Sequence, residues 1–164
     1  MASNIQPEIF IRMVLLNWEM QNERLNSLLD KLTDEQLASA TAPGRNTGTY
    51  LLGHLVAIND AIMPLLSFDD KLYPELYEAF VNKPDNSGLE FPPVSELKIY
   101  WKNITEKLRQ HFANMPDEEW FTRHMSVSEE DFAKEPHRNK LNIIINRTNH
   151  QSYHMGQLAY LAGK

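Results

Sequence analysis

The chain has 164 residues, a formal net charge of -6 and no cysteine. This length suits a single domain over residues 1–164, the missing cysteines exclude disulfides and thiolate-bound metals, and the acidic balance offers no basic surface for nucleic acid. The N-terminal stretch MASNIQPEIF lacks the regions of a secretory signal and no apolar run has the length of a membrane helix, so we expect a cytoplasmic protein without a membrane partner.

The first predicted helix covers residues 7–32. Its apolar residues recur at spacings of three and four, which predicts one apolar face: Ile9, Met13, Leu16, Met20, Leu25, Leu28, Leu29 and Leu32. Directly afterwards, Thr33 and Gln36 have the spacing of a capping box, in which each side chain bonds to the backbone of the other residue. A short helix is therefore expected to begin at Thr33.

The second predicted helix covers residues 47–63, with Asn46 or Thr47 as its N-cap. It is apolar on most sides (YLLGHLVAI), which indicates deep burial, and Pro64 is expected to kink or end it. The third covers residues 94–115 and has an apolar seam typical of bundle helices: Val94, Leu97, Trp101, Ile104, Leu108 and Met115. The fourth covers residues 140–162, and Gly163 is expected to be its C-cap.

Four helices of this length, with few strand signals, predict an all-α four-helix bundle with short extra helices in its connections. Two connections, residues 67–93 and 116–139, are long for a bundle. The stretch YPELYEAF in the first of them favours a short helix. Connections of this length form lids and pocket walls in some proteins and only cover the surface in others, and both interpretations stay open.

Three histidines fall on two of the predicted helices. His150 and His154 are four residues apart, so both rings lie on one face of the last helix and can converge on one ion. His54 lies in the apolar run of the second helix, where an imidazole needs a polar partner. If these two helices adjoin, the three rings meet as a metal site; the alternative is three hydrogen-bonded histidines of the core.

Three neutral imidazoles leave a coordination position open, which is typical of catalytic rather than structural sites. A bound water would have a lowered pKa, and a thiol brought by a second substrate could be activated in the same way. Gln151 follows His150, so the H-E-x-x-H motif of metalloproteases is absent, as is any Glu-x-x-His motif of di-iron bundles. Imidazole suits zinc, nickel, copper and iron alike.

Other polar and aromatic residues fall near these histidines along the helices. Asn146 and Gln157 lie on or near the ligand face of the last helix, and Tyr50 precedes His54 by one turn. They are candidates to hydrogen-bond the imidazoles or to line a pocket, or else they are ordinary polar residues at the mouth of the bundle. Trp18 is a candidate to line the pocket, or a core residue.

The segments GHLVAIND, around His54, and NHQSYHMGQLAYL, with His150 and His154, resemble those of the DinB-like, or YfiT-like, metal-dependent enzymes. The short acidic helix after the first long helix fits the same layout. The resemblance implies a four-helix bundle that forms a homodimer. It also implies a divalent metal, zinc or nickel, bound by His54, His150 and His154.

Characterised relatives of that family include thiol S-transferases that use bacillithiol or mycothiol and a thiol-dependent isomerase. Two hypotheses follow for this chain. The first is a metal-dependent enzyme acting on a small-molecule substrate, either a transferase that uses a low-molecular-weight thiol as co-substrate or a hydrolase that uses metal-bound hydroxide. The second is a non-catalytic metal-binding protein of the stress response.

Overall fold

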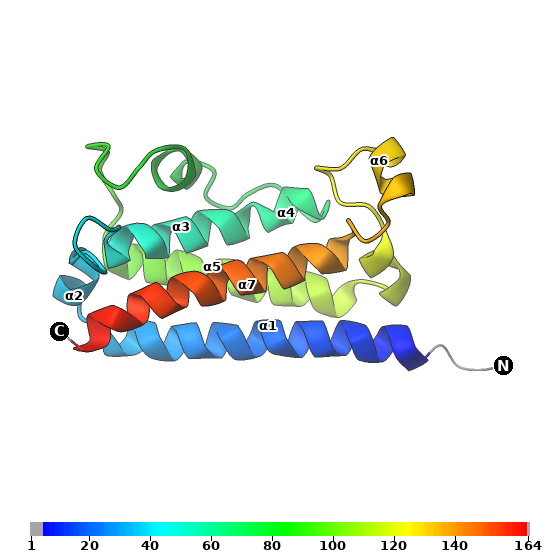
Figure 1. The fold of residues 1–164 in the computed structure, drawn as a ribbon, viewed down its shortest axis with the longest axis horizontal. Helices are drawn as coiled ribbons and strands as arrows, with labels where there is room; N and C mark the ends of the chain where they lie inside the picture. The colour runs from blue at the N-terminus through cyan, green and yellow to red at the C-terminus, as the bar shows by residue number, and fades with distance from the viewer. Residues whose placement is uncertain (1–4, 164) are drawn as a thin grey trace.

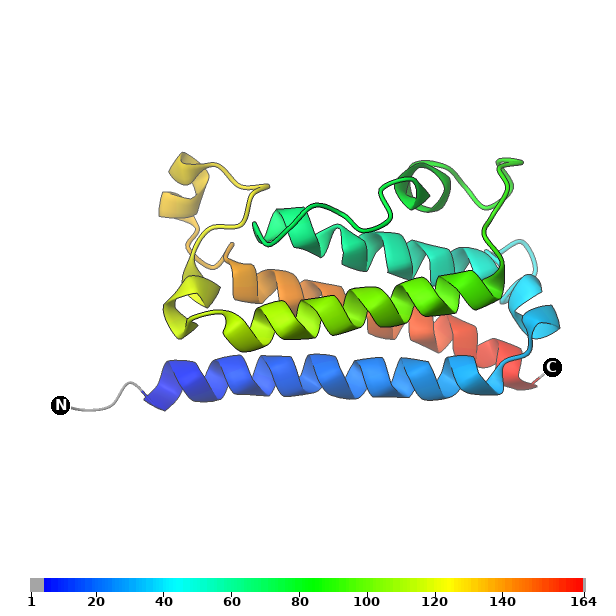
Figure 2. The same ribbon diagram turned by 180° about the vertical axis from the view of Figure 1, so that it is seen from behind.

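Four long helices form the predicted bundle in the computed structural model, which describes residues 5–163 (Figure 1). They are α1 (Ile5–Lys31), α3 (Gly48–Asp60), α5 (Val94–Asn114) and α7 (Lys140–Ala159). Figures 1 and 2 show that α1 and α7 run in one direction and α3 and α5 in the other. Across residues 5–163 there is no β-strand, only two isolated bridges, and no helix there is long and apolar enough to span a bilayer.

Short helical segments fill the connections, as expected for this fold. They are α2 (Asp34–Ala38), α4 (Ile62–Leu65), the π-helical turn η1 (Glu78–Asn82), the 3-10 turn η2 (Asp117–Phe121), α6 (Glu129–Lys134) and the 3-10 turn η3 (Tyr160–Gly163). The capping box before α2 is confirmed, since Thr33 and Gln36 bond to each other's backbone N–H groups. The N-cap of α3 is Thr47, whose hydroxyl accepts from the N–H of Tyr50 at 3.2 Å.

The predicted break near Pro64 is confirmed. Helix α3 ends at Asp60, and α4 continues after Ala61 for one short turn. Proline has no N–H to donate to the carbonyl four residues earlier, which here belongs to Asp60, and its ring crowds that carbonyl. At the other end of the chain, the C-cap prediction for Gly163 is wrong. Helix α7 ends at Ala159 and continues as a 3-10 turn that includes Gly163.

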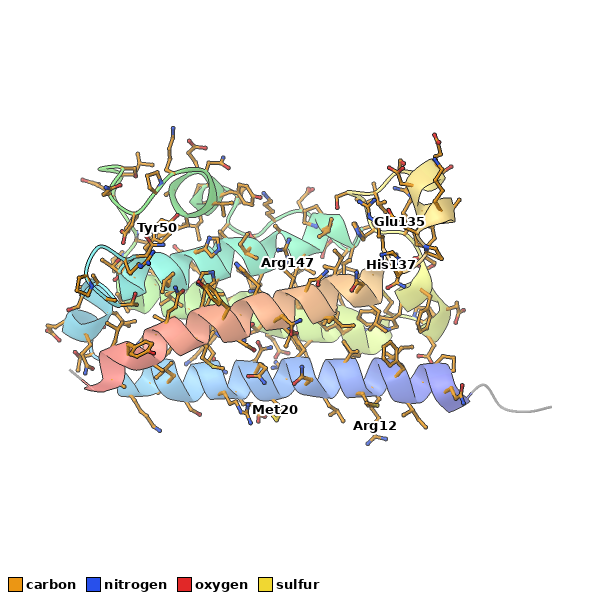
Figure 3. All side chains as sticks on the ribbon, in the orientation of Figure 1. Arg12, Met20, Tyr50, Glu135, His137 and Arg147 are labelled. Carbon is orange, nitrogen blue, oxygen red and sulfur yellow. The ribbon has the colours of Figure 1, made fainter. Side chains whose placement is uncertain are left out.

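Helix α1 has two apolar faces rather than the single face predicted from its spacing. The seam that enters the core has spacings of seven, four, three, four and three: Ile11, Trp18, Asn22, Leu25, Leu29 and Leu32. The four residues that begin the predicted face, namely Ile9, Met13, Leu16 and Met20, are exposed instead. Figure 3 shows Met20 on the outer side of α1, away from the bundle. The predicted face therefore combined the exposed apolar residues of the first half of α1 with the buried apolar residues of its second half.

The connection between α4 and α5, residues 67–93, lies along α3 and is fastened to it by hydrogen bonds. At the start of α3, the N–H of Thr47 donates to Asp85 (2.6 Å) and the hydroxyl of Tyr50 donates to the carbonyl of Lys83 (2.7 Å). At its end, Asp60 accepts from the N–H groups of Leu72 and Tyr73 (2.8 Å each). The short helix expected in YPELYEAF is confirmed: Leu76 and Tyr77 form a helical turn that continues into η1, and η1 buries Phe80. This connection therefore forms a wall over α3.

Candidate metal centre

Three histidines from two helices meet beneath that wall. His54 comes from α3, and His150 and His154 come from successive turns of α7. The Nε2 atom of His150 lies 3.2 Å from Nε2 of His54 and 3.0 Å from Nε2 of His154. All three side chains are partly buried, and they are a group that could hold a metal ion. The expected meeting of the second and fourth long helices is thus observed.

In two of these rings, the hydrogen-bond partner of Nδ1 determines which ring nitrogen carries the proton. Nδ1 of His54 is 2.7 Å from the backbone carbonyl of Phe80, and Nδ1 of His154 is 2.7 Å from Oε1 of Gln157. Both partners are acceptors, so each Nδ1 must carry the hydrogen. The Nε2 atoms of His54 and His154 therefore present lone pairs toward the same point.

Nε2 of His150 lies between two nitrogen lone pairs, those of His54 and His154. A bound cation stabilises such an arrangement. Nε2 of His150 can donate a hydrogen to only one of its two neighbours, which leaves the other lone pair without a donor. A tetrahedral ion about 2.0–2.1 Å from each nitrogen would separate the nitrogens by about 3.3 Å, close to the observed 3.0 and 3.2 Å. The donor set and its spacing fit a divalent ion.

The surroundings of the cluster keep its imidazoles neutral, which is the form that binds metal. The pKa of His150 is lowered to about 4, chiefly by burial and then, in decreasing order, by the charges of His154, His54 and Arg147. Burial also lowers the pKa of His54, against the effect of its bond to Phe80. The pKa of His154 is lowered by burial too, although Gln157 opposes the shift.

The bond from His54 to Phe80 depends on a glycine in the same helix. Gly53 packs against the Phe80 ring so closely that a Cβ at this position would overlap the ring atoms. The missing side chain lets η1 approach α3 until the carbonyl of Phe80 reaches His54. In metal sites such outer hydrogen bonds fix the orientation of the ligand ring. Nδ1 of His150, by contrast, is buried and has no hydrogen-bond partner within residues 5–163.

The remaining predicted site residues take different positions. Gln157 accepts the hydrogen bond from His154. Tyr50 is buried, stacks on the His54 ring with centroids 6.3 Å apart, and donates to Lys83 rather than to an imidazole. Asn146 is exposed on α7 and makes no hydrogen bond to the three rings. Trp18 is a core residue, 2% exposed, whose ring packs edge-on against Phe112.

The other three histidines lie outside the cluster. His111 is 3.0 Å from a carboxylate oxygen of Asp69. His124 is buried and its Nδ1 accepts from Ser126. His137 is exposed in the connection before α7 (Figure 3).

Two groups of the site were not identified from the sequence. The carbonyl of Phe80 has no sequence signal of its own, although a glycine beside His54 could have suggested a close approach of backbone. Arg147 precedes His150 by one turn of α7 and lowers the pKa of both His54 and His150. The signal available in the sequence was its position three residues before His150 and seven before His154, a spacing that places all three residues on one face of the helix.

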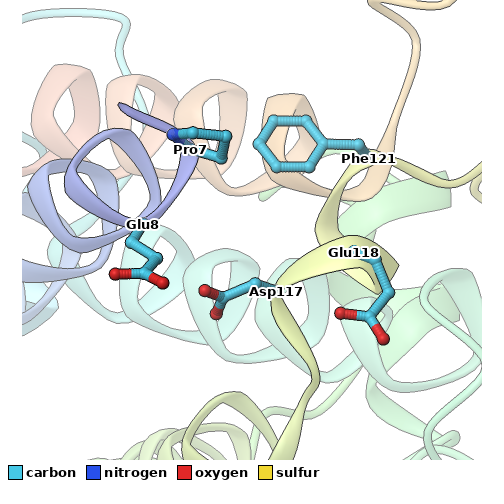
Figure 4. Close-up of a pocket in the computed structure, with 5 residues that line it drawn as sticks. All are labelled: Pro7, Glu8, Asp117, Glu118 and Phe121. Carbon is cyan, nitrogen blue, oxygen red and sulfur yellow. The ribbon is translucent and has the colours of Figure 1, made fainter. Parts of the chain in front are cut away.

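A cavity lies apart from the histidine cluster. It has a volume of about 470 Å³ and is lined by Pro7 and Glu8 of α1 and by Asp117, Glu118 and Phe121 of η2 (Figure 4). None of these residues belongs to the histidine cluster, and three of the five are acidic. The cavity therefore contributes nothing to the chemistry of the three imidazoles.

Comparison with known proteins supports the fold and identifies the family. A crystal structure of a conserved protein from Enterococcus faecalis has the same fold, with a TM-score of 0.64 and 16% sequence identity over 92% of this chain and 94% of that chain. No curated protein matches the chain. The sequence profile of the DinB superfamily matches residues 17–158, which include all three histidines of the cluster. The chain belongs to the DinB superfamily.

Proposed function

We propose that the protein is a metal-dependent enzyme in which His54, His150 and His154 bind a divalent ion, zinc or nickel, next to a small-molecule substrate. The observation that carries the proposal is the convergence of three Nε2 atoms, two of which present lone pairs. Neutral imidazole suits both metals. Three protein ligands also leave room for a further ligand, as catalytic sites do.

The reaction we propose is transfer of a group to a low-molecular-weight thiol of the bacillithiol type. A bound divalent ion supplies Lewis acidity, which lowers the pKa of a thiol placed beside it. Among residues 5–163, no carboxylate forms a hydrogen bond with the three histidines, so we propose no acidic side chain as a base to activate water. A thiol, with a pKa of about 8.5, needs far less activation than water, at about 15.7.

The proposed step is a substitution at carbon. The thiol gives up its proton to solvent, and its sulfur forms a bond to an electrophilic carbon of the second substrate. The bond from that carbon to the leaving group breaks, and the leaving group departs with the electron pair as an anion, which is bromide when the electrophile is an alkyl bromide. No oxidant or reductant is needed. The cytoplasm, which keeps thiols reduced, is the compartment that this reaction requires.

The protein's own groups orient and shelter the reacting centre. The carbonyl of Phe80 and the amide of Gln157 hold the rings of His54 and His154 with their Nε2 atoms inward. Burial keeps these rings neutral, so they do not repel an ion electrostatically. The connection along α3 covers one side of the site and limits access of water from that side.

The experiment is a turnover assay with metal-loaded protein. Zinc- and nickel-loaded samples are mixed with monobromobimane and, in turn, bacillithiol, mycothiol and glutathione, and formation of the thioether is followed by fluorescence. We expect turnover above the uncatalysed rate with at least one thiol, lost on chelation and in His154→Ala. His137→Ala, which removes an exposed histidine outside the cluster, should retain the activity.

Other outcomes would contradict the proposal. Thiol turnover that survives His154→Ala would show that the metal site is not the catalyst. Hydrolysis of an activated ester without any thiol dependence would instead favour the hydrolase. Stoichiometric metal without turnover of either kind would favour a non-catalytic metal-binding protein of the stress response.

A homodimer is the second part of the proposal, and the exposed face of α1 supports it. Ile9, Met13, Leu16 and Met20 are each between 42% and 62% exposed. Their spacings of four, three and four read the same in both directions, so an antiparallel second copy could pair these four apolar residues with one another. A two-fold dimer requires such a self-complementary patch. Arg12 and Met20 both lie on this outer side of α1 in Figure 3.

A further inference from the structure

Arg147 is a partly buried cation with no hydrogen-bond or ion-pair partner among residues 5–163. It projects from α7 one turn before His150 and lies where α7 faces α3 (Figure 3). Its Nε atom is buried and has no hydrogen-bond acceptor, and no carboxylate forms an ion pair with it in residues 5–163. Burial lowers the pKa of Arg147, although the group remains a cation.

This isolation distinguishes Arg147 from the other shielded cations of the described chain. Each of the others has an acceptor or an aromatic face: Lys71 with the Tyr77 ring, Lys98 with the Leu29 carbonyl, Lys107 with Asp69, Arg123 with the Val127 carbonyl, Arg138 with Glu135, and Lys140 with Glu119. A shielded charge that lacks a partner is destabilising. A residue that functions in binding an anion would show this pattern.

Within residues 5–163, no carboxylate forms an ion pair with Arg147 or a hydrogen bond with the three imidazoles. The charge of Arg147 lowers the pKa of His54, His150 and His124, which places all three within reach of its field. The group that favours its charged form is Tyr77, from the connection along α3, and a tyrosine hydroxyl is uncharged at neutral pH. A divalent ion on the histidines would add two further positive charges beside these groups.

We infer that Arg147 binds a carboxylate of the ligand that occupies the histidine site, an inference that rests on the proposed function. A guanidinium offers Nε–H and Nη–H side by side, and this pair matches the two oxygens of a carboxylate. The free Nε–H is half of that pair. A thiolate at the ion and a carboxylate at Arg147 together offset most of the positive charge, so the site selects a ligand that carries both groups or a pair of substrates that share them.

The test compares two thiols that differ only in charge. Cobalt-loaded protein is titrated with 3-mercaptopropionate and with 3-mercapto-1-propanol, and the thiolate-to-cobalt absorption band reports binding. A hydrogen-bonded charge pair favours the carboxylate thiol by about tenfold to a hundredfold. Arg147→Met should remove this preference by lowering the affinity for the carboxylate thiol far more than that for the neutral thiol, whereas Arg147→Lys should restore part of it.

The matched control is Arg45→Met, because Arg45 is exposed in the loop before α3 and should leave the preference unchanged. A preference that persists in Arg147→Met would overturn the inference. A neutral thiol that gives no absorption band even with wild-type protein would count against the proposed function rather than against Arg147.

The role of Arg147 can then be judged in metal-free protein by the NMR signal of its Nε–H group. Propionate should shift this signal and propionamide should not; an unmoved signal with both would overturn the inference. In steady-state kinetics, Arg147→Met should raise KM only for the substrate that bears the carboxylate, with little change in kcat. This selectivity distinguishes a carboxylate on the thiol from one on the electrophile.

Discussion

The ring of His54 and the backbone of Phe80 are joined by a hydrogen bond of 2.7 Å from Nδ1 to the carbonyl oxygen. The bond links helix α3 to η1, 26 residues further along the chain. Because it uses the backbone of Phe80, the orientation of the imidazole depends on how closely η1 approaches α3. That approach depends in turn on Gly53, whose position leaves space for the Phe80 ring.

Gly53→Ala should therefore weaken metal binding without removing a ligand. The added methyl group displaces the Phe80 ring, and the carbonyl moves away from His54. Loss of such an outer hydrogen bond costs about tenfold to a hundredfold in metal affinity, which competition with a chromogenic chelator can measure. The control is Gly156→Ala on α7, where an added Cβ meets no atom within 4 Å. It should keep its affinity and gain about 1 kcal/mol of stability from helix propensity.

Gln157→Ala should also reduce the affinity for zinc or nickel by about tenfold to a hundredfold, since His154 loses the acceptor for its Nδ1–H. Asn146→Ala changes an exposed residue of the same helix that makes no hydrogen bond to the cluster, so its affinity should equal that of wild type. Isothermal titration of both variants with zinc gives the comparison. Equal affinities in the two variants would contradict the role given to Gln157.

Removal of a ligand should reduce stability only when metal is present. An ion that binds only the folded state adds about 2.7 kcal/mol when its free concentration is one hundred times Kd, which corresponds to about 5–11 °C in Tm for a chain of this size. His54→Ala should lose this increment, and excess chelator should bring wild type close to the variant. If chelator leaves the Tm of wild type unchanged, the cluster does not hold an ion in solution.

The stability of the metal-free protein should fall in mildly acid solution. Histidines of the unfolded chain titrate near a pKa of about 6.5, whereas burial lowers the pKa of His150 to about 4 in the folded protein. Between these values the unfolded chain binds protons that the folded chain does not, so stability rises with pH across this window and is lost as pH falls through it. Urea midpoints measured from about pH 4.5 to 7.5 should show this slope, and His150→Gln should reduce it, leaving the part that comes from the lowered pKa values of His54 and His154.

Charge placed on the exposed face of α1 should prevent dimer formation. Met13→Glu and Leu16→Glu bring like charges together across a two-fold axis, and both positions are exposed, so the monomer should still fold. Light scattering during gel filtration measures the mass. Ile99→Glu changes an equally exposed apolar residue, but on α5, and should leave a dimer intact. A wild-type mass of 19.0 kDa would refute this part of the proposal.

Local sequence rules predicted the helices because each rests on chemistry within one turn. The capping box of Thr33 and Gln36, the N-cap Thr47 and the break before Pro64 all involve residues no more than four positions apart. The face of α1 was mispredicted for the same reason. Ile9, Met13, Leu16 and Met20 have a helical period, and the period alone does not say which of two apolar faces meets the other helices.

The meeting of the three histidines was predictable because an imidazole in an apolar run needs a polar partner, and His150 and His154 were available. Their orientation was not predictable. It depends on the carbonyl of Phe80, which every residue type has, and on a contact of Gly53 that only the packed structure reveals. Arg147 was missed because an arginine on a helix commonly reaches solvent or a carboxylate, whereas here its Nε is buried and has no acceptor in residues 5–163.

The fastening of residues 67–93 along α3 has a consequence for how the protein is degraded. A protease accepts its target as an extended strand, so a loop must first detach from the body of the protein before it can be cut. This connection is tied near both ends and in the middle, by Asp85, Phe80 and the N–H groups of Leu72 and Tyr73, and the ties have to release together. Despite its irregular backbone, it should survive digestion as long as the helices do.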